Sequence, residues 1–425
     1  MSEKTMKNSP KLRFPEFIGD KQWEETIIEE ISKRITAGAT PSTTNSNYWN
    51  GNIRWMNSGE LNLKRVYEVE GRITEEGLKN SSTKLIPKNC ILIGLAGQGK
   101  TRGTVATNMI ELCTNQSIAS IFPNKKVFVS DFLYHNLDKR YNELRDLSAG
   151  GGGRGGLNLQ IIKSIPIQLP TIEEQQKIVD CLNSIDSLIF TQSQKIELLK
   201  EHRNGLLQNL FPKDDENVPK IRFTEFLNDG KWEKTTIGKI GNFYYGKSAP
   251  KWSLEEDALT PCVRYGELYT KFGTVITETY SRTNIDPKNL KFSKGGEILI
   301  PRVGEKPEDF GKCCCYLPLE NIAIGEMVSV FETSQNPLFY TYYFRNLYKK
   351  FANVVEGQNV KNLYYVELEP IEIYCPSLEE QQKITDCLTS IDEEINLQNQ
   401  KVESLKEHKK ALLQQLFPSS EVING

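Results

Sequence analysis

The sequence has few of the residues that build metal centres. It holds only three histidines in 425 residues, with no H-x-x-x-H pair, and its nine cysteines include no C-x-x-C pair. Cys313, Cys314 and Cys315 are adjacent and cannot chelate one ion together without strain. Because zinc sites combine spaced Cys and His ligands, this pattern argues against a metal site. It favours a reduced, cytoplasmic protein.

Long hydrophobic runs and an excess of one charge are also missing. No apolar run approaches the ~18–20 residues of a membrane span. The N-terminal "MSEKTMKNSPKLRF" lacks the apolar core of a secretory signal. We therefore expect no membrane association. The formal net charge of −2 does not by itself indicate a nucleic-acid binder.

Two stretches of the chain occur twice. "PKLRFPEFIGDKQWEE" (10–25) returns without a gap as "PKIRFTEFLNDGKWEK" (219–234), and both copies keep the arginine, the glutamate and the tryptophan. The longer stretch 170–212 returns as 376–418, with 28 of 43 aligned positions identical. Such repetition predicts an internal pseudo-twofold repeat.

The repeat divides the chain into a conserved segment, a variable domain and a long helix, each present twice. The expected boundaries are 1–31 for the N-terminal conserved segment, 32–168 for the first variable domain, 169–212 for the first helix, 213–240 for a linker with the second conserved segment, 241–374 for the second variable domain, 375–418 for the second helix, and 419–425 for a tail. Short β-branched runs such as "CILIG" and "EILIP" predict mixed α/β domains, with one helix in each at "SDFLYHNLDKRYNELRDL" and "NPLFYTYYFRNLYKKF".

The repeated long stretches carry an apolar seam at alternating spacings of three and four residues. This heptad pattern lasts more than four heptads, which is typical of a coiled coil. Polar residues interrupt both seams at matching places, Gln192 with Gln398 and Arg203 with Lys409, and such residues disfavour other registers. The residues expected to pair the helices and set their spacing are Ile185, Ile189, Gln192, Leu199, Ile391, Ile395, Gln398 and Leu405. Packing of each seam on its own domain is the alternative.

The stretch "GLAGQGKT" (94–101) matches the phosphate-binding pattern G-x-x-x-x-G-K-[ST]. A working phosphate loop leads into a helix, whereas here "RGTVATNMIELC" follows and favours a second strand. The matching position of the second half reads "PRVGEKPEDFG" (301–311), without the Gly-Lys-Thr. A glycine-rich hairpin that carries Lys100 and Arg102 is therefore the better interpretation.

A second stretch, "NPLF" (336–339), approaches a four-residue motif of amino-methyltransferases but lacks one of its prolines. We therefore interpret it as the start of a helix.

The layout resembles the specificity (S) subunit of type I restriction–modification systems. The resemblance rests on two variable domains, each followed by a "P-[TS]-[IL]-E-E-Q-Q-K-I" helix that ends in "L-F-P", and on "ITAGATPS" (35–42). "YWNGNIRWMNSGEL" (48–61) also looks like part of a target-recognition domain. The second domain departs from the opening motif at "YYGKSAP" (244–250).

The resemblance implies an α+β fold, with two mixed α/β target-recognition domains separated by a pair of long antiparallel coiled-coil helices. It implies a non-catalytic subunit that reads a bipartite target in double-stranded DNA, with one half-site per domain. Two methyltransferase subunits and the restriction subunits would be its partners. No cofactor is expected in this chain, since S-adenosylmethionine, ATP and magnesium would belong to the partner subunits. The alternatives are a P-loop nucleotide-binding enzyme and a structural coiled-coil scaffold.

Charge is distributed unequally between the two variable domains. Residues 32–169 hold 18 Lys and Arg against 10 Asp and Glu, whereas residues 241–375 hold 15 against 17. Only the first domain therefore has the basic excess typical of a phosphate-facing surface. The candidate DNA-binding residues are Arg54, Lys100, Arg102 and Arg154 in the first domain, and Lys247, Arg264, Arg302, Asn359, Lys361 and Asn362 in the second. No catalytic residue is nominated.

Overall fold

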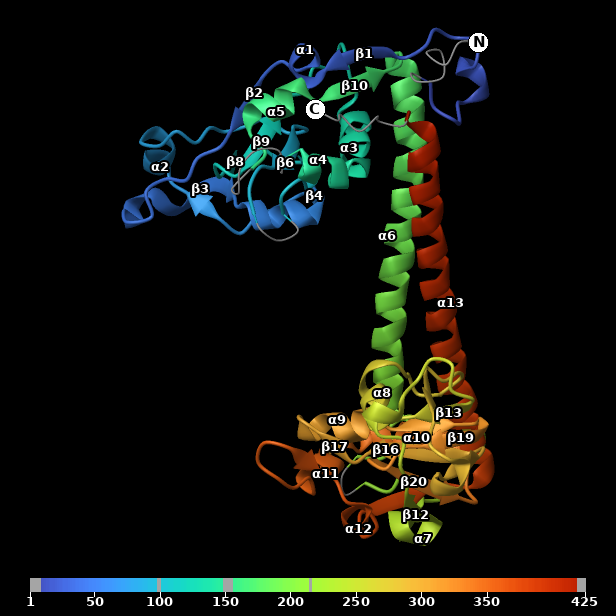
Figure 1. The fold of residues 1–425 in the computed structure, drawn as a ribbon. Helices are drawn as coiled ribbons and strands as arrows, with labels where there is room; N and C mark the ends of the chain where they lie inside the picture. The colour runs from blue at the N-terminus through green and yellow to red at the C-terminus, as the bar shows by residue number, and fades with distance from the viewer. Residues whose placement is uncertain (1–8, 98–100, 148–155, 214–215, 419–425) are drawn as a thin grey trace. The chain divides into compact units, whose positions relative to one another are not determined.

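The computed structural model describes residues 9–97, 101–147, 156–213 and 216–418, and the chain divides into two compact units (Figure 1). Unit one takes its residues from 1–192 and 401–425, and unit two from 193–400. The two long helices, α6 (Ile172–Asn209) and α13 (Leu378–Leu416), contribute to both units. Neither long helix therefore belongs to one unit alone.

Unit one contains three sheets, with strand orders β2-β9-β6-β7-β4, β5-β3-β8 and β1-β10. The strands are β1 (Glu24–Ile27), β2 (Ile35–Ala37), β3 (Trp49–Met56), β4 (Arg65–Val66), β5 (Arg72–Ile73), β6 (Ile91–Gly94), β7 (Val105–Asn108), β8 (Cys113–Thr114), β9 (Ile118–Ile121) and β10 (Pro166–Leu169). Its shorter helices are α1 (Ile28–Ile31), α2 (Glu75–Lys79), α3 (Ser130–Lys139), α4 (Tyr141–Asp146) and α5 (Leu159–Ser164). Strands β6 and β9 are buried along their whole length, and Ser120 is the one polar residue within them.

Unit two contains sheets with strand orders β12-β20-β16-β18, β14-β13-β19-β15, β11-β22 and β17-β21. The strands are β11 (Glu233–Thr236), β12 (Gly241–Tyr245), β13 (Thr260–Val263), β14 (Ser281–Thr283), β15 (Phe292–Lys294), β16 (Glu297–Pro301), β17 (Val303–Gly304), β18 (Cys315–Leu317), β19 (Glu320–Ile324), β20 (Val328–Thr333), β21 (Lys361–Asn362) and β22 (Glu372–Cys375). Its shorter helices are α7 (Ile237–Ile240), α8 (Tyr265–Thr270), α9 (Pro307–Lys312), α10 (Pro337–Asn346), α11 (Tyr348–Asn353) and α12 (Tyr365–Leu368).

The two units share a topology although their variable sequences have diverged. The order β2-β9-β6-β7 of unit one matches β12-β20-β16-β18 of unit two. Strand β3 pairs antiparallel with β5 and parallel with β8, and β13 pairs in the same two ways with β14 and β19. The internal repeat therefore runs through the variable domains, and the expected mixed α/β class with paired long helices is confirmed.

The sequence predicted one helix in each variable domain, and this prediction is wrong in detail. Each splits into two consecutive helices, α3 and α4 in unit one and α10 and α11 in unit two. The breaks fall at Arg140 and Leu347, whose ψ angles of 21° and 12° depart from helical geometry. The predicted helix start at Asn336 is confirmed, because its side chain accepts a hydrogen bond from the Phe339 amide at the beginning of α10.

In unit one, the arginine and the tryptophan of the repeated segment 10–25 pack against a glutamate of the repeated long helix. Arg13 donates to both carboxylate oxygens of Glu174 at 2.8 and 2.7 Å, and Trp23 Nε1 donates to the same carboxylate at 3.3 Å. The Trp23 ring is buried against Phe132 of α3 and Phe417, which follows α13. The end of the second long helix thus completes the first core.

Unit two repeats this cluster. Arg222 donates to both oxygens of Glu380 at 2.8 and 2.7 Å, and Trp232 packs on Phe339 of α10. Phe211, which follows α6, packs on Phe339 in the position that Phe417 takes in unit one. Packing inside each unit therefore explains the repeated "R-F-x-E-F", "E-E-Q-Q" and "L-F-P" sequences.

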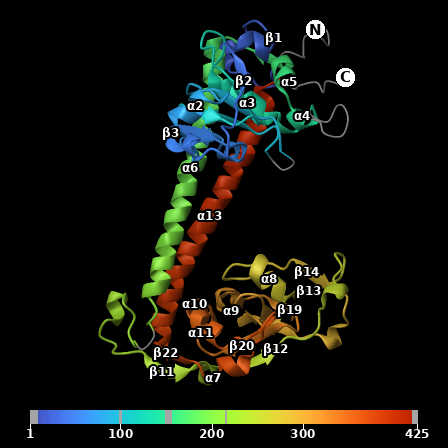
Figure 2. The same cartoon turned by 90° about the vertical axis from the view of Figure 1, so that its left-hand side faces the viewer.

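The long helices lie side by side and antiparallel within each unit (Figures 1 and 2). In unit one Lys409 of α13 donates to both carboxylate oxygens of Asp186 of α6, at 2.6 and 2.8 Å. In unit two Arg203 of α6 pairs with Asp392 of α13. Lys409 matches Arg203 in the sequence repeat, and Asp186 matches Asp392. The two ion pairs are therefore equivalent, with the cation on α13 in unit one and on α6 in unit two. A pseudo-twofold antiparallel pair of helices produces this pattern.

The predicted seam residues are partly or fully buried. Ile185 and Ile395 are buried, whereas Ile189, Leu199, Ile391 and Leu405 are half-buried. Gln398 is buried and donates to Glu394 at 2.9 Å. Its side-chain oxygen and that of half-buried Gln192 have no hydrogen-bond partner among the described residues. Pairing by these residues is consistent with the geometry, while their part in spacing the recognition domains stays a prediction.

Candidate nucleic-acid interface

The glycine-rich stretch of unit one connects two antiparallel strands. Ile93 of β6 pairs with Val105 of β7, and the amide of Gly103 donates to the Gly94 carbonyl at 2.9 Å. Gly103 has a φ of +77°, which glycine adopts without strain. A phosphate loop would lead into a helix, whereas here β7 follows, so the predicted hairpin is confirmed. Lys100 of this stretch lies outside the described residues.

In unit two, three of the predicted basic residues surround one turn. This turn, Ile324–Val328, connects β19 to β20. The amide of Lys247 donates to the Ile324 carbonyl at 2.8 Å, and the amide of Arg302 donates to Met327 at 3.0 Å. Arg264 directly follows β13, whose last residue Val263 accepts from Gly325 at 2.9 Å. We call Lys247, Arg264 and Arg302 with this turn the turn edge of unit two.

The other three candidates of unit two lie on a hairpin beside this edge. Glu356 and Asn362 exchange backbone hydrogen bonds of 2.9 and 2.8 Å, and Asn359 is exposed in the loop between them. Strand β21, which is Lys361 and Asn362, pairs with β17 immediately after Arg302. The structure therefore brings all six candidates of this domain to one end of its sheets.

Unit one has an equivalent edge around the turn Thr114–Ile118. Ala39 donates to Thr114 at 2.9 Å and Leu95 donates to Ser117 at 2.8 Å, so these residues occupy the positions of Lys247 and Arg302. Asn57 follows β3 as Arg264 follows β13, and the backbone amide of each donates to the glutamate three residues later, Glu60 at 2.9 Å and Glu267 at 2.8 Å. We call Ala39, Asn57 and Leu95 with this turn the turn edge of unit one. Its three matching positions carry no charge.

The remaining candidates of unit one are placed differently from those of unit two. Arg54 lies within β3 and donates from Nε and Nη2 to Glu68, at 3.0 and 3.1 Å, and this guanidinium lowers the Glu68 pKa to about 2. Arg102 lies in the β6–β7 hairpin. Arg154 lies outside the described residues. The ion pair of Arg54 leaves its guanidinium less available to a phosphate than that of an unpaired arginine.

Sequence reasoning missed a basic cluster of unit one. Lys33, Lys88, Lys125 and Lys126 line a cavity of about 530 Å³, together with a single carboxylate, Glu111. The cavity lies where β6 begins and β9 ends, which is the opposite end of the sheet from the turn edge. The four lysines come from three separate segments, so only the folded sheet brings them together.

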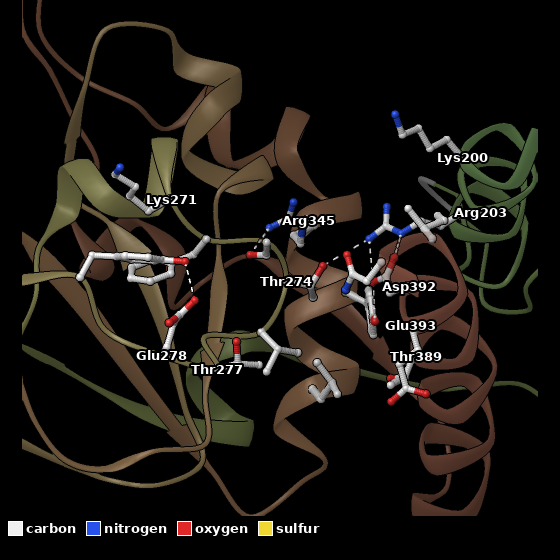
Figure 3. Close-up of a pocket in the computed structure, with 18 residues that line it drawn as sticks. Lys200, Arg203, Lys271, Thr274, Thr277, Glu278, Arg345, Thr389, Asp392 and Glu393 are labelled. Carbon is white, nitrogen blue, oxygen red and sulfur yellow. Dashed lines mark hydrogen bonds and ion pairs between the residues drawn. The ribbon is translucent and has the colours of Figure 1, made fainter. Parts of the chain in front are cut away.

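A cleft of about 640 Å³ separates the loop 271–280 of unit two from its long-helix segments (Figure 3). Arg203 pairs with Asp392 and donates to Thr274 Oγ1 at 3.3 Å, and the Tyr342 hydroxyl donates to Asp392 at 2.8 Å. Arg345 donates to the Cys314 carbonyl at 2.8 Å. Arg203 and Asp392 neutralise each other, and the bond from Arg203 to Thr274 links the loop to the helix segments at this cleft.

No helix of the described residues combines the length and apolar character of a membrane span. Within the same ranges, no group of three or more His, Cys, Asp or Glu side chains is arranged to hold a metal ion.

The fold and the edges define a two-domain protein with paired helices, in which each unit presents a matching edge with different side chains. The family profile described as "Type I restriction modification DNA specificity domain" matches residues 20–201 and 229–407. The chain belongs to this family and is a specificity subunit of a type I restriction–modification system. Its relatives support neither a nucleotide-hydrolysing enzyme nor a purely structural scaffold.

Individual relatives agree with this assignment. The chain is 27% identical over 409 residues to the type I restriction enzyme MjaIX specificity subunit of Methanocaldococcus jannaschii, covering 93% of each. It is 31% identical over 174 residues to the EcoR124I/EcoR124II specificity subunit of Escherichia coli, covering 40% of this chain and 42% of that one. The crystal structure of the S subunit of a type I restriction–modification system from M. genitalium has the same fold, with a TM-score of 0.58 at 17% identity over 97% of this chain and 100% of that one.

Proposed function

We propose that residues 32–168 and 241–374 are two target-recognition domains, each reading one half of a split sequence in double-stranded DNA. The observation that carries this proposal is the pair of matching turn edges, which differ in side chains on an equivalent backbone. A protein distinguishes DNA base pairs by the pattern of hydrogen bonds that their edges offer. Domains of one fold that recognise different base sequences therefore need different side chains at equivalent backbone positions. The other segments of the repeat would form the support and the helical spacer.

In this proposal the long helices determine the gap between the two half-sites. Helix α6 has 38 residues, which corresponds to about 57 Å at 1.5 Å per residue. Inserting one heptad into both helices adds about 10 Å, or about three base pairs, to the spacer. A gap that stays unchanged in the recognised sequence would contradict the role of the helices while leaving the recognition domains standing.

We infer that two methyltransferase subunits dock on this chain and that restriction subunits join the assembly. Adenine N6 methylation with S-adenosylmethionine, and ATP- and magnesium-dependent translocation and cleavage, would then belong to those partners. The support is membership in the type I specificity family. Co-purification with the partner subunits and native mass spectrometry would give the stoichiometry. An assembly without a methyltransferase subunit would contradict the inference.

The decisive experiment maps methylated adenines in the genome of cells with and without this gene. We expect one motif, two short half-sites separated by a fixed gap, to lose methylation on deletion and to regain it on complementation. An unchanged methylation map in the presence of active partner subunits would refute the proposed function. A dependent motif with a single continuous site would refute the two-domain division.

A further inference from the structure

The side chain of Arg302 is held between two aromatic rings at the end of β16. Its guanidinium carbon lies 4.5 Å from the centre of the Tyr245 ring and 5.3 Å from that of Tyr364. The backbone is fixed on both sides, because the Arg302 amide donates to Met327 at 3.0 Å and its carbonyl accepts from Leu363 at 2.9 Å. The guanidinium is therefore oriented before any ligand arrives.

This guanidinium has no acidic partner in the described part of the chain. Arg302 forms no ion pair there, and its Nε is buried without a hydrogen-bond acceptor. Other half-buried arginines of the protein, such as Arg203 and Arg222, are paired with carboxylates. Nε is enclosed by the protein, whereas Nη1 and Nη2 are not buried and have no hydrogen-bond partner among the described residues. These two terminal groups are therefore the donors available to an acceptor supplied from outside.

The fold does not require arginine or the two tyrosines at these positions. In unit one Leu95 occupies the position of Arg302 and makes the same backbone hydrogen bond to its turn. The strand register places Ala37 where unit two has Tyr245, and Asn158 precedes α5 as Tyr364 precedes α12. The stacked arginine is thus an addition of unit two to a shared framework.

We propose that Arg302 reads a guanine in the half-site of the second recognition domain, an inference that rests on the proposed function. A guanidinium presents donors in a planar fork that matches the O6 and N7 acceptors of guanine in the major groove. Stacking on Tyr245 and Tyr364 reduces the conformational freedom lost on binding. Lys247, with its exposed side chain on the same edge, is suited to a neighbouring phosphate.

The test compares Arg302→Met and Arg302→Lys with the wild type in the assembled complex. Methionine keeps an unbranched apolar stem against the tyrosines but removes every donor, whereas lysine keeps the charge without the fork. Lys125→Met, which removes an exposed cation at the opposite end of the unit one sheet from its turn edge, is the control for loss of a positive charge outside both edges. Genomic methylation maps give the motif, and competition between duplexes altered at single base pairs gives the discrimination.

We expect both Arg302 variants to relax one guanine position in one half-site, with at least about fivefold lower discrimination there. The other half-site should keep its specificity, and Lys125→Met should leave the whole motif unchanged. If Arg302 has only a structural role, Arg302→Met should leave the recognised motif unchanged. That result would overturn the inference. Uniform weakening across all duplexes indicates a phosphate contact and overturns it equally, as does relaxation at an A·T pair.

A second variant covers the case in which Arg302→Met does not fold. Tyr364→Leu removes one ring while Arg302 stays, so it should relax the same position to a smaller extent; a motif unchanged in this folded variant would count against the inference. The failure of the proposed function is recognised separately. In that case cells with the wild-type gene show no methylated split motif. If the wild type gives a split motif that folded Arg302→Met and Tyr364→Leu both leave intact, only the role of Arg302 is refuted.

Discussion

The two recognition domains differ in where they carry positive charge. Residues 32–169 have the larger basic excess in sequence, yet the matching positions of their turn edge are Ala39, Asn57 and Leu95. The second domain is slightly acidic in sequence, but its edge carries Lys247, Arg264 and Arg302. The net charge of a domain therefore does not indicate the charge of the surface proposed to read DNA, and the fold decides which residues meet there.

The largest effect should come from the arginine–glutamate cluster that both units share. Glu174→Gln and Glu380→Gln each leave a largely buried arginine without its counter-charge, Arg13 or Arg222. We expect each to lower the free energy of unfolding of its own unit by about 3–5 kcal/mol, measured by urea denaturation. If one unit tolerates the change with a loss under about 1 kcal/mol, the two clusters are not energetically equivalent.

The control for this prediction uses a second glutamate of the same repeat. Glu16 and Glu225 pair with Lys177 and Lys383, and these pairs are exposed. Glu16→Gln and Glu225→Gln should therefore leave the free energy of unfolding nearly unchanged, because solvent screens exposed ion pairs.

The units should also differ in acid. Burial lowers the pKa of His135 in α3 to about 4 from its ordinary value of 6.5, whereas the matching residue of α10 is Tyr342, whose pKa is raised by burial. The unfolded chain then binds more protons between about pH 6.5 and 4, so unit one loses stability as pH falls through this range, by up to about 3 kcal/mol.

Unfolding at a series of pH values measures this difference. His135→Gln should flatten the profile of unit one between pH 6.5 and 4 and leave that of unit two unchanged. A profile that retains its full slope in the variant would assign the acid sensitivity to other groups.

Changing one lysine of the turn edge of unit two tests whether this edge binds DNA. Lys247→Ala should weaken binding of the assembled complex to all sequences and reduce the slope of log affinity against log salt by about 1. Ala39→Lys, the reciprocal change in unit one, should raise that slope by a similar amount. Lys125→Ala, in the cavity at the opposite end of the first sheet, is the control; a larger effect of Lys125→Ala than of Lys247→Ala would move the interface to that end.

The smallest effect concerns the ion pairs between the long helices. Asp186→Asn in unit one and Asp392→Asn in unit two remove the partners of Lys409 and Arg203, which are half-buried. We expect losses of about 1 kcal/mol or less, somewhat larger for Asp392 because Tyr342 also donates to it. Thermal unfolding of both variants and of Arg203→Asp with Asp392→Arg, which should restore the pair, provides the measurement.

The sequence predicted the features that depend on patterns of residue type. The long helices follow from periodicity, and the hairpin after β6 follows from strand propensity and from comparison of the two halves. Recurrence marked the residues around Trp23 without revealing their contacts. It did not reveal that "YYGKSAP" and "ITAGATPS" open the two domains in the same way, because the equivalence lies in backbone hydrogen bonds from Ala39 and Lys247. It gave no reason to choose Asp186 and Asp392, since aspartates on a long helix are usually solvated.

The prediction for Arg54 shows a further limit of sequence reasoning. Its position in a basic domain suggested a phosphate contact, but it pairs with Glu68, which comes from another segment. Conversely, the aromatic setting of Arg302 is assembled from β12, the end of β16 and the residue before α12. Neighbours that are distant in the chain decide whether a cation is neutralised or available, and composition does not report them.

The position of Phe417 in the first core affects how the protein is made. Trp23 and Phe132 leave the ribosome early, but the ring that packs on both is among the last to be synthesised. Domains generally fold in order of synthesis as they emerge. Here the N-terminal unit cannot close its core until translation reaches the end of α13, so a prematurely terminated product would expose apolar surface in the half of the protein that was made first.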